Sequence, residues 1–143
     1  MVGIIILSHG NYALEIVNTI ETIHGKNHNI IPIVLEDNES LESYEKRVQE
    51  SISNSLFDKH LILIDFLGGT PFNATQKLVM NPNIEIITGV NIPMVLNIIS
   101  CDSKNLREIS QEAEKAGKCG VVNVSQIIKN KLNEELMGAE KLW

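Results

Sequence analysis

The chain has few cysteines, and it has no long apolar run. Cys101 and Cys119 are its only two cysteines and lack CxxC spacing, which argues against a disulfide framework or a zinc site. No apolar run approaches the roughly 20 residues that span a bilayer. The N-terminal MVGIIIL has no basic region before its short apolar stretch, so it is typical of a first strand rather than a signal peptide. These absences predict a reduced, cytoplasmic protein.

An excess of positive charge is also missing. Twelve basic residues stand against eighteen acidic ones, for a formal net charge of −6 that is spread along the chain. This balance argues against nucleic acid or an anionic membrane as the main partner. The length of 143 residues, with no internal repeat, low-complexity tract or linker, predicts a single domain over residues 1–143.

Short runs rich in Val, Ile and Leu alternate with longer segments of helical period. This alternation predicts an α/β fold, doubly wound, with a mostly parallel sheet covered by helices on both faces. The predicted strands are Gly3–Leu7, Ile30–Leu35, His60–Phe66, Ile84–Thr88 and a last short one at Gly120–Val124.

Six helices are expected between and after these strands. Helical spacing and capping residues place them from Ala13 to Gly25, from Ser40 to Leu56, from Thr70-Pro71, from Asn91 to Pro93 onwards, from Ser103 to Ala116, and from Ser125 to about Met137, the last being shorter. His24 and His28 then fall in a solvated loop region rather than forming a metal pair, and His60 is expected to be structural.

The most reactive side chains follow the first and third strands. In a sheet of order 2-1-3-4 the functional crevice lies at the carboxyl ends of these two strands. His9 follows the first strand and Asp65 ends the third, so their side chains are predicted to hydrogen-bond. A carboxylate on one imidazole nitrogen fixes the tautomer and leaves the other nitrogen free to attack. His9 and Asp65 are therefore the candidate catalytic pair.

A glycine pair follows Asp65 directly before a predicted helix. Gly68 and Gly69 let the backbone approach a ligand, and the helix that starts at Thr70 offers free N–H groups that suit a phosphate. The combination predicts a histidine that accepts a phosphoryl group, with Gly68, Gly69 and Thr70 binding the phosphoryl oxygens. No metal, nucleotide or other cofactor is implied.

Four other readings of this pattern fail on missing residues. A histidine phosphatase needs an Arg directly before the histidine and a second His later, but Ser8 precedes His9 and no histidine follows His60. A tetrapyrrole chelatase also needs a downstream metal-binding His. A receiver domain needs an acidic cluster after the first strand, and a P-loop needs a lysine that GGTPFN lacks.

Three motifs carry a resemblance to a known family. The SHG after the first strand, DFLGGTPFN from Asp65 to Asn73, and GVNIPM from Gly89 to Met94 resemble the IIA components of the mannose-type sugar phosphotransferase system. The resemblance covers nearly the whole chain. The sequence departs from it at Phe66 and Leu67, where some members have a hydroxyl residue and a tryptophan.

The resemblance implies a function and partners. The residue matching His9 would take a phosphoryl group from the phosphocarrier protein HPr and pass it to a IIB component, which serves membrane IIC and IID subunits during sugar uptake. The aspartate matching Asp65 would orient the histidine. Asn11, Asn73, Asn91, Pro93 and Met94 are the candidate partner-binding residues.

The same resemblance also implies a homodimer. The last predicted strand, Gly120–Val124, would then cross to the partner and extend its sheet in antiparallel orientation. Two alternatives stay open from the sequence. One is the phosphotransferase subunit of a dihydroxyacetone kinase, and the other is a noncatalytic regulatory module that is phosphorylated on His9.

Overall fold

The computed structural model describes residues 1–26 and 29–140. Four parallel strands form one sheet: β1 (Val2–His9), β2 (Ile30–Leu35), β3 (Lys59–Ile64) and β4 (Ile84–Thr88). Their order is β2-β1-β3-β4, as predicted. Each strand is rich in Ile, Leu or Val, and the central strands β1 and β3 are buried over almost their whole length because helices cover both faces.

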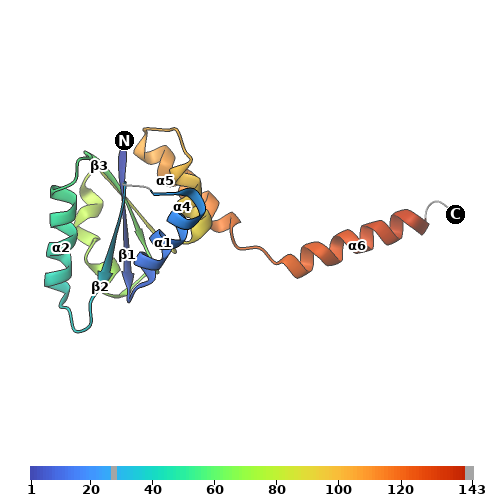
Figure 1. Ribbon diagram of the computed structural model, residues 1–143, viewed down its shortest axis with the longest axis horizontal. Coiled ribbons are helices and arrows are strands. Elements are labelled where there is room, and N and C mark those ends of the chain that lie inside the picture. Colours follow the sequence, from blue (N-terminus) through green and yellow to red (C-terminus); the bar gives the residue numbers. More distant parts are fainter. Residues whose placement is uncertain (27–28, 141–143) are drawn as a thin grey trace.

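Two groups of helices cover the sheet (Figure 1). On one face lie α1 (Tyr12–His24), α4 (Ile92–Ile99) and α5 (Leu106–Cys119), packed on inward side chains such as Ile6 and Leu63. On the other face lie α2 (Leu41–Ser53), the short α3 (Gly69–Asn73) and the 3₁₀ helix η1 (Gln76–Met80). The alternation along each strand therefore fills two separate cores.

Several predicted boundaries are confirmed by hydrogen bonds at the helix ends. The Ser40 hydroxyl accepts from the Ser43 amide at the start of α2, and the Asn91 side chain accepts from the Met94 amide at the start of α4. Gly25 follows α1 directly. The end of α2 was placed too late, because the helix ends at Ser53 and Leu56 lies outside it, almost fully exposed.

Other boundaries differ from the predictions. β3 ends at Ile64, so Phe66 belongs to the following loop rather than to the strand. α3 begins at Gly69 with Gly68 before it, so Thr70 lies inside the first turn and does not cap it. α5 begins at Leu106, because the Asn105 side chain rather than Ser103 caps it. No pattern in the sequence predicted the 3₁₀ helix η1 (Gln76–Met80), which is wound more tightly than an α-helix.

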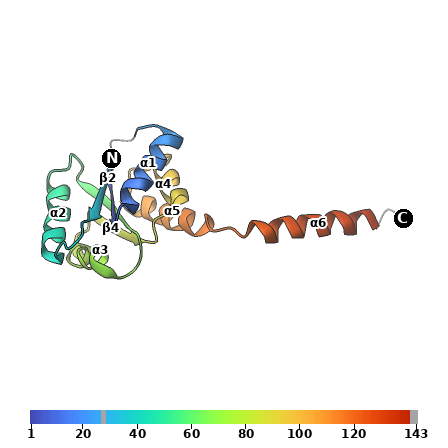
Figure 2. The same cartoon turned by 60° about the horizontal axis from the view of Figure 1, so that its bottom comes forward.

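The C-terminal region departs most from the prediction. Within the described residues of the single chain, 120–124 form no strand: Gly120 follows the end of α5 and Val124 begins α6 (Val124–Glu140). α6 is longer than α5, not shorter, and the Asn123 side chain accepts from the Gln126 amide at its start. It stands away from the body of the molecule in two views (Figures 1 and 2).

Two further results concern membrane-spanning helices and the histidines other than His9. Among residues 1–26 and 29–140, no helix is both long and apolar enough to cross a membrane. His24 is the last residue of α1 and is exposed, whereas His28 lies outside the described residues. His60 is buried in β3, as the prediction of a structural role requires.

Candidate functional site

The register of β1 and β3 brings His9 and Asp65 together. Leu7 lies opposite Ile64 in this parallel pair, and the Asp65 amide donates to the Leu7 carbonyl at 3.1 Å. His9 therefore ends β1 beside the first residue after β3. Both residues lie at the carboxyl edge of the sheet, between the two central strands, where the prediction placed the crevice.

The Asp65 carboxylate fixes the position of the imidazole. Its Oδ2 accepts from the His9 backbone amide and from His9 Nδ1, both at 2.8 Å. Its Oδ1 accepts from the Phe66 amide at 2.9 Å. An ionised carboxylate only accepts hydrogen bonds, so the proton of a neutral His9 sits on Nδ1 and the lone pair on Nε2. The predicted hydrogen bond between the two side chains is thus present.

The pair is buried on one side and open on the other. The Asp65 side chain is 10% exposed, whereas that of His9 is 38% exposed. The carboxylate is thereby shielded from water while the imidazole stays accessible from solvent. This is the arrangement that a histidine nucleophile needs, because the charge it gains is stabilised from behind.

Gly69 lies directly against the reactive nitrogen. Its φ of +74° falls in the region that favours glycine, and a Cβ there would lie 2.7 Å from His9 Nε2. Gly68, with φ +113°, makes the preceding turn. The Gly69 backbone therefore borders the space beside Nε2, and the half-buried Thr70 follows it in the first turn of α3. Any other residue at position 69 would push a side chain into that space.

Phe66 is a neighbour that the sequence prediction did not assign to the site. Its ring stacks on the His9 imidazole with centroids 4.9 Å apart and planes inclined by 15°. No spacing rule predicts this contact, because the direction of a loop side chain depends on how the chain leaves β3. The only available signal was an apolar aromatic residue directly after a strand-ending aspartate.

Three hydroxyl groups join the secondary-structure elements and loops that surround the sheet. Ser8 Oγ accepts from the Ala13 amide at 2.7 Å, which secures the first turn of α1. The Tyr12 hydroxyl donates to the Val90 carbonyl at 3.0 Å and so joins α1 to the loop after β4. Tyr44 donates to the Ile33 carbonyl at 2.6 Å, and burial raises the pKa of its hydroxyl, which keeps it a neutral donor.

The five predicted partner-binding residues differ in exposure. Asn11, Asn73 and Pro93 are exposed. Asn91 is half-buried, and besides capping α4 it donates to the Gly117 carbonyl at 3.1 Å. Met94 is only 3% exposed and packs in the core with α5, so its own side chain offers a partner no surface in this chain.

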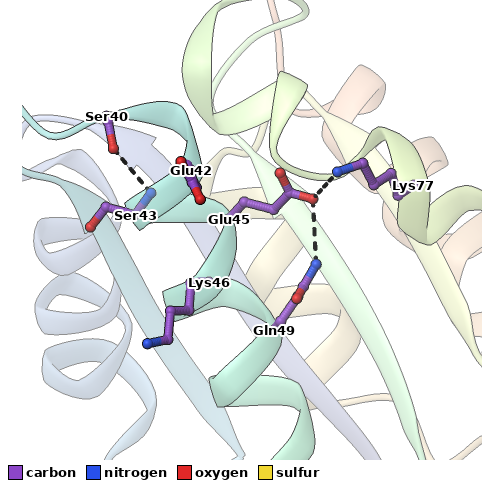
Figure 3. A pocket seen from close by; sticks show the side chains of 7 residues that line it. All are labelled: Ser40, Glu42, Ser43, Glu45, Lys46, Gln49 and Lys77. Atoms are coloured by element: carbon purple, nitrogen blue, oxygen red, sulfur yellow. Dashed lines mark hydrogen bonds and ion pairs between the residues drawn. The ribbon is translucent and has the colours of Figure 1, made fainter.

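A polar hollow on another part of the surface lies along α2 and beside η1 (Figure 3). Glu45 accepts from Lys77 at 2.8 Å across it, and the lining groups include Ser40, Ser43 and Lys46. None of these residues belongs to the predicted site. In the part of the chain that the structure describes, no group of three or more His, Cys, Asp or Glu side chains is placed to hold a metal ion.

The sequence of the chain is similar to those of known proteins. The family described as "PTS system fructose IIA component" (EIIA-man) matches residues 3–115. The chain is 24% identical to the fructose-specific EIIA component of Bacillus subtilis, over 79% of this chain and 84% of that protein. It is 30% identical to the mannose-specific EIIAB component of Escherichia coli K12, over 84% of this chain but only 38% of that longer protein.

Solved structures agree with the sequence matches. A phosphotransferase system component EIIA from Streptococcus agalactiae superposes with a TM-score of 0.81 at 26% identity, covering 88% of this chain and 99% of that one. A PTS IIA protein associated with the fucose utilization operon of Streptococcus pneumoniae gives a TM-score of 0.75 at 29% identity, over 88% and 95% of the two chains.

Proposed function

Because the chain belongs to the EIIA-man family of phosphotransferase system IIA components, we propose that it is a phosphotransferase that carries a phosphoryl group on His9. It accepts the group from the phosphocarrier protein HPr and passes it to a IIB component during phosphoenolpyruvate-dependent sugar uptake. The observation that carries the proposal is the hydrogen bond from His9 Nδ1 to Asp65 Oδ2 at 2.8 Å, which leaves Nε2 free.

The transfer is an in-line displacement between two imidazoles. The lone pair of His9 Nε2 forms a bond to phosphorus while the bond from phosphorus to the donor's nitrogen breaks, and the donor ring keeps that electron pair. The Nδ1 proton stays on His9, so the phosphorylated ring is positively charged. Asp65 stabilises this charge through the bond it already makes. The reverse sequence delivers the group to the IIB component.

The phosphoryl oxygens are held by the chain that follows Asp65. Gly69 lies against Nε2, which supports the proposal that its backbone N–H and those of the adjoining Gly68 and Thr70 bind the phosphoryl group. The Thr70 hydroxyl supplies a further donor. Catalysis then comes from positioning and electrostatics, without a metal or nucleotide.

A relay uses one surface for two partners in turn. Phe66, which stacks on His9, and Leu67, which follows it in the loop, are 52% and 71% exposed, and Tyr12 at the start of α1 is 46% exposed. Asn11, Asn73, Asn91 and Pro93 complete the proposed docking surface for HPr and IIB. We expect small, transient interfaces there. The membrane IIC and IID subunits are reached only through IIB, which places this protein in the cytoplasm.

A homodimer is the second part of the proposal. β4 is an edge strand, and a hollow of about 600 Å³ beside it is lined by Ile86, Ile87, Thr88 and Val121 among others. Val121, Val122 and Val124 are more than half exposed in the segment that leaves the body. Pairing of residues 120–124 with β4 of a second copy, in antiparallel orientation, would cover both apolar surfaces. We expect full-length protein to show twice the monomer mass by light scattering.

The first experiment is intact mass after incubation with phosphoenolpyruvate, enzyme I and HPr. Wild-type protein is expected to gain one acid-labile phosphate, and His9→Ala to gain none. His24→Ala is the matched control, because His24 is exposed at the end of α1 and is expected to leave uptake intact. A wild-type chain without phosphate, or a phosphorylated His9→Ala chain, would overturn the proposal.

A further inference from the structure

Phe66 covers one face of the His9 imidazole without taking part in either hydrophobic core. The near-parallel rings, 4.9 Å between centroids, have the offset-stacked geometry that aromatic pairs prefer. Phe66 belongs to neither of the two buried clusters and is 52% exposed. Its position is therefore not explained by burial in the protein interior.

The other contacts of Phe66 also point to the reactive nitrogen. A Cβ built on Gly69 would lie 3.6 Å from Phe66 Cζ and 2.7 Å from His9 Nε2. The far end of the phenyl ring, the Gly69 backbone and Nε2 thus meet at one place. On Gly68 the added Cβ would lie 4.0 Å from Phe66 Cε2, so the same turn supports the ring.

Asp65 sets the relative position of the two rings. Oδ1 of Asp65 accepts from the Phe66 amide at 2.9 Å. Oδ2 accepts from the His9 backbone amide and from His9 Nδ1, both at 2.8 Å. The backbone that carries the phenyl ring and the imidazole itself are therefore held by the same group. A change of side chain at position 66 leaves all three of these hydrogen bonds possible.

We propose that Phe66 is a positioning residue for phosphoryl transfer, which holds the His9 ring against Asp65 and stabilises it when it becomes charged. This inference rests on the proposed function. The hydrogen bond at Nδ1 leaves the imidazole free to tilt about the line of that bond, and the stacked ring limits the tilt. Nε2 is then kept pointing along the Gly69 backbone, where the phosphoryl group arrives.

The charge on the ring gives the stack a second effect. As Nε2 bonds to phosphorus and the donor's P–N bond breaks, His9 keeps its Nδ1 proton and becomes cationic. A cation over an aromatic face is attracted by the ring quadrupole, and at an exposed site this attraction corresponds to about a two- to fivefold change in an equilibrium or rate. Phe66 also covers one side of the ring from water.

The test compares Phe66→Leu with Phe66→Tyr and with Leu56→Ala. Leucine keeps apolar bulk but has no π face, and tyrosine restores the face. Leu56 is an exposed apolar residue in the loop between α2 and β3, at the opposite edge of the sheet. The initial rate of phosphoryl uptake from HPr is expected to fall about two- to tenfold in Phe66→Leu. It should return to within twofold of wild type in Phe66→Tyr and stay there in Leu56→Ala.

A spectroscopic readout on the unphosphorylated protein accompanies the rates. The ring current of Phe66 shifts the NMR resonances of the carbon-bound protons of His9, so these resonances should move in Phe66→Leu and return in Phe66→Tyr. Uptake that falls with leucine and is not restored by tyrosine would overturn the proposal, as would wild-type rates and unshifted resonances in Phe66→Leu. A wild-type protein that takes up no phosphate would overturn the proposed function and this inference together, so the two failures are distinct.

Discussion

The two ends of the central strand pair each hold a histidine, and the two differ in almost every physical respect. His9 ends β1 at the carboxyl edge, with its side chain 38% exposed and Nδ1 bonded to Asp65. His60 lies near the start of β3 at the opposite edge and is 3% exposed. Among the described residues, its Nε2 has no hydrogen-bond partner.

A glycine lies against each of these imidazole rings. A Cβ on Gly69 would lie 2.7 Å from His9 Nε2, and one on Gly3 would lie 2.9 Å from His60 Cδ2. The same pairing of ring and backbone therefore serves two purposes. At one end a carboxylate and an opening to solvent suit the nucleophile that we propose, whereas at the other end the ring is buried in the packed interior. The environment, rather than the residue type, decides the role.

The largest effect is expected from changing Asp65, the carboxylate that is hydrogen-bonded to His9 Nδ1. In Asp65→Asn the amide can donate to Nδ1, which favours the tautomer with its proton on Nε2 and removes the nucleophilic lone pair. Phosphoryl uptake should slow on the order of 10²- to 10⁴-fold, measured as the initial rate with HPr as donor. His60→Phe should keep the wild-type rate, and a normal rate in Asp65→Asn would contradict the assigned role of the carboxylate.

The second prediction changes the glycine at the carboxyl edge. Gly69→Ala places a methyl group against Nε2 and strains a backbone with φ +74°. We expect uptake to fall about tenfold or more, because the methyl group occupies the space through which phosphorus must approach. The measurement is again the initial rate, with thermal unfolding to show that the protein is folded. Uptake within twofold of wild type would mean that the phosphoryl group approaches from another side.

The sequence predicted the hydrogen bond between His9 and Asp65, because apolar strand runs and the residues that follow them are local features of the sequence. The apolar runs fixed β1 and β3, and parallel pairing then required His9 and Asp65 to meet at one edge. The stack of Phe66 on His9 was not predictable in this way. β3 ends two residues earlier than predicted, so Phe66 lies in a loop, and its direction depends on the path of that loop. Burial of Met94 was missed because the family resemblance placed this residue in the partner-binding surface.

The fold was predicted well in the body of the molecule. Beyond it, the helix expected from Ser125 is present as α6, but the described residues 120–124 form no strand in the single chain. Four parallel strands and the ends of α1 and α4 follow from periodicity and capping residues. The segment 120–124 reads as a strand because it is rich in valine, but a strand needs a neighbour, and in the single chain it has none. Propensity alone does not supply the partner.

The third prediction changes the glycine at the amino edge. Gly3→Ala would place a methyl group 2.9 Å from His60 Cδ2 and 3.0 Å from Phe57 Cδ2, inside a packed region. Overpacking of this kind costs about 1–3 kcal/mol, so Tm should fall by several degrees while phosphoryl uptake stays within twofold. A calorimetric scan and the uptake assay are made on the same sample. A variant with lost uptake and unchanged Tm would show that the two ends of the sheet are coupled.

The smallest effect is a pH dependence of stability that belongs to His60. Burial lowers the pKa of His60 below its usual value of 6.5, although nearby Asp58 opposes this shift. As pH falls below about 6.5, the unfolded chain takes up a proton that the folded protein resists, so the free energy of unfolding falls. Between pH 7.5 and 5.5 the unfolded chain's own protonation bounds this loss at about 1.4 kcal/mol.

His60→Phe isolates that contribution from those of the other titrating groups. The variant keeps a flat ring beside Gly3 but has no proton to gain, so its free energy of unfolding should fall less than that of wild type between the two pH values. Urea unfolding at pH 7.5 and 5.5 measures the difference, and equal losses in the two proteins would refute the prediction. A smaller loss in the variant means that burial without a partner makes His60 sensitive to acid, whereas His9, with its carboxylate, is placed for chemistry.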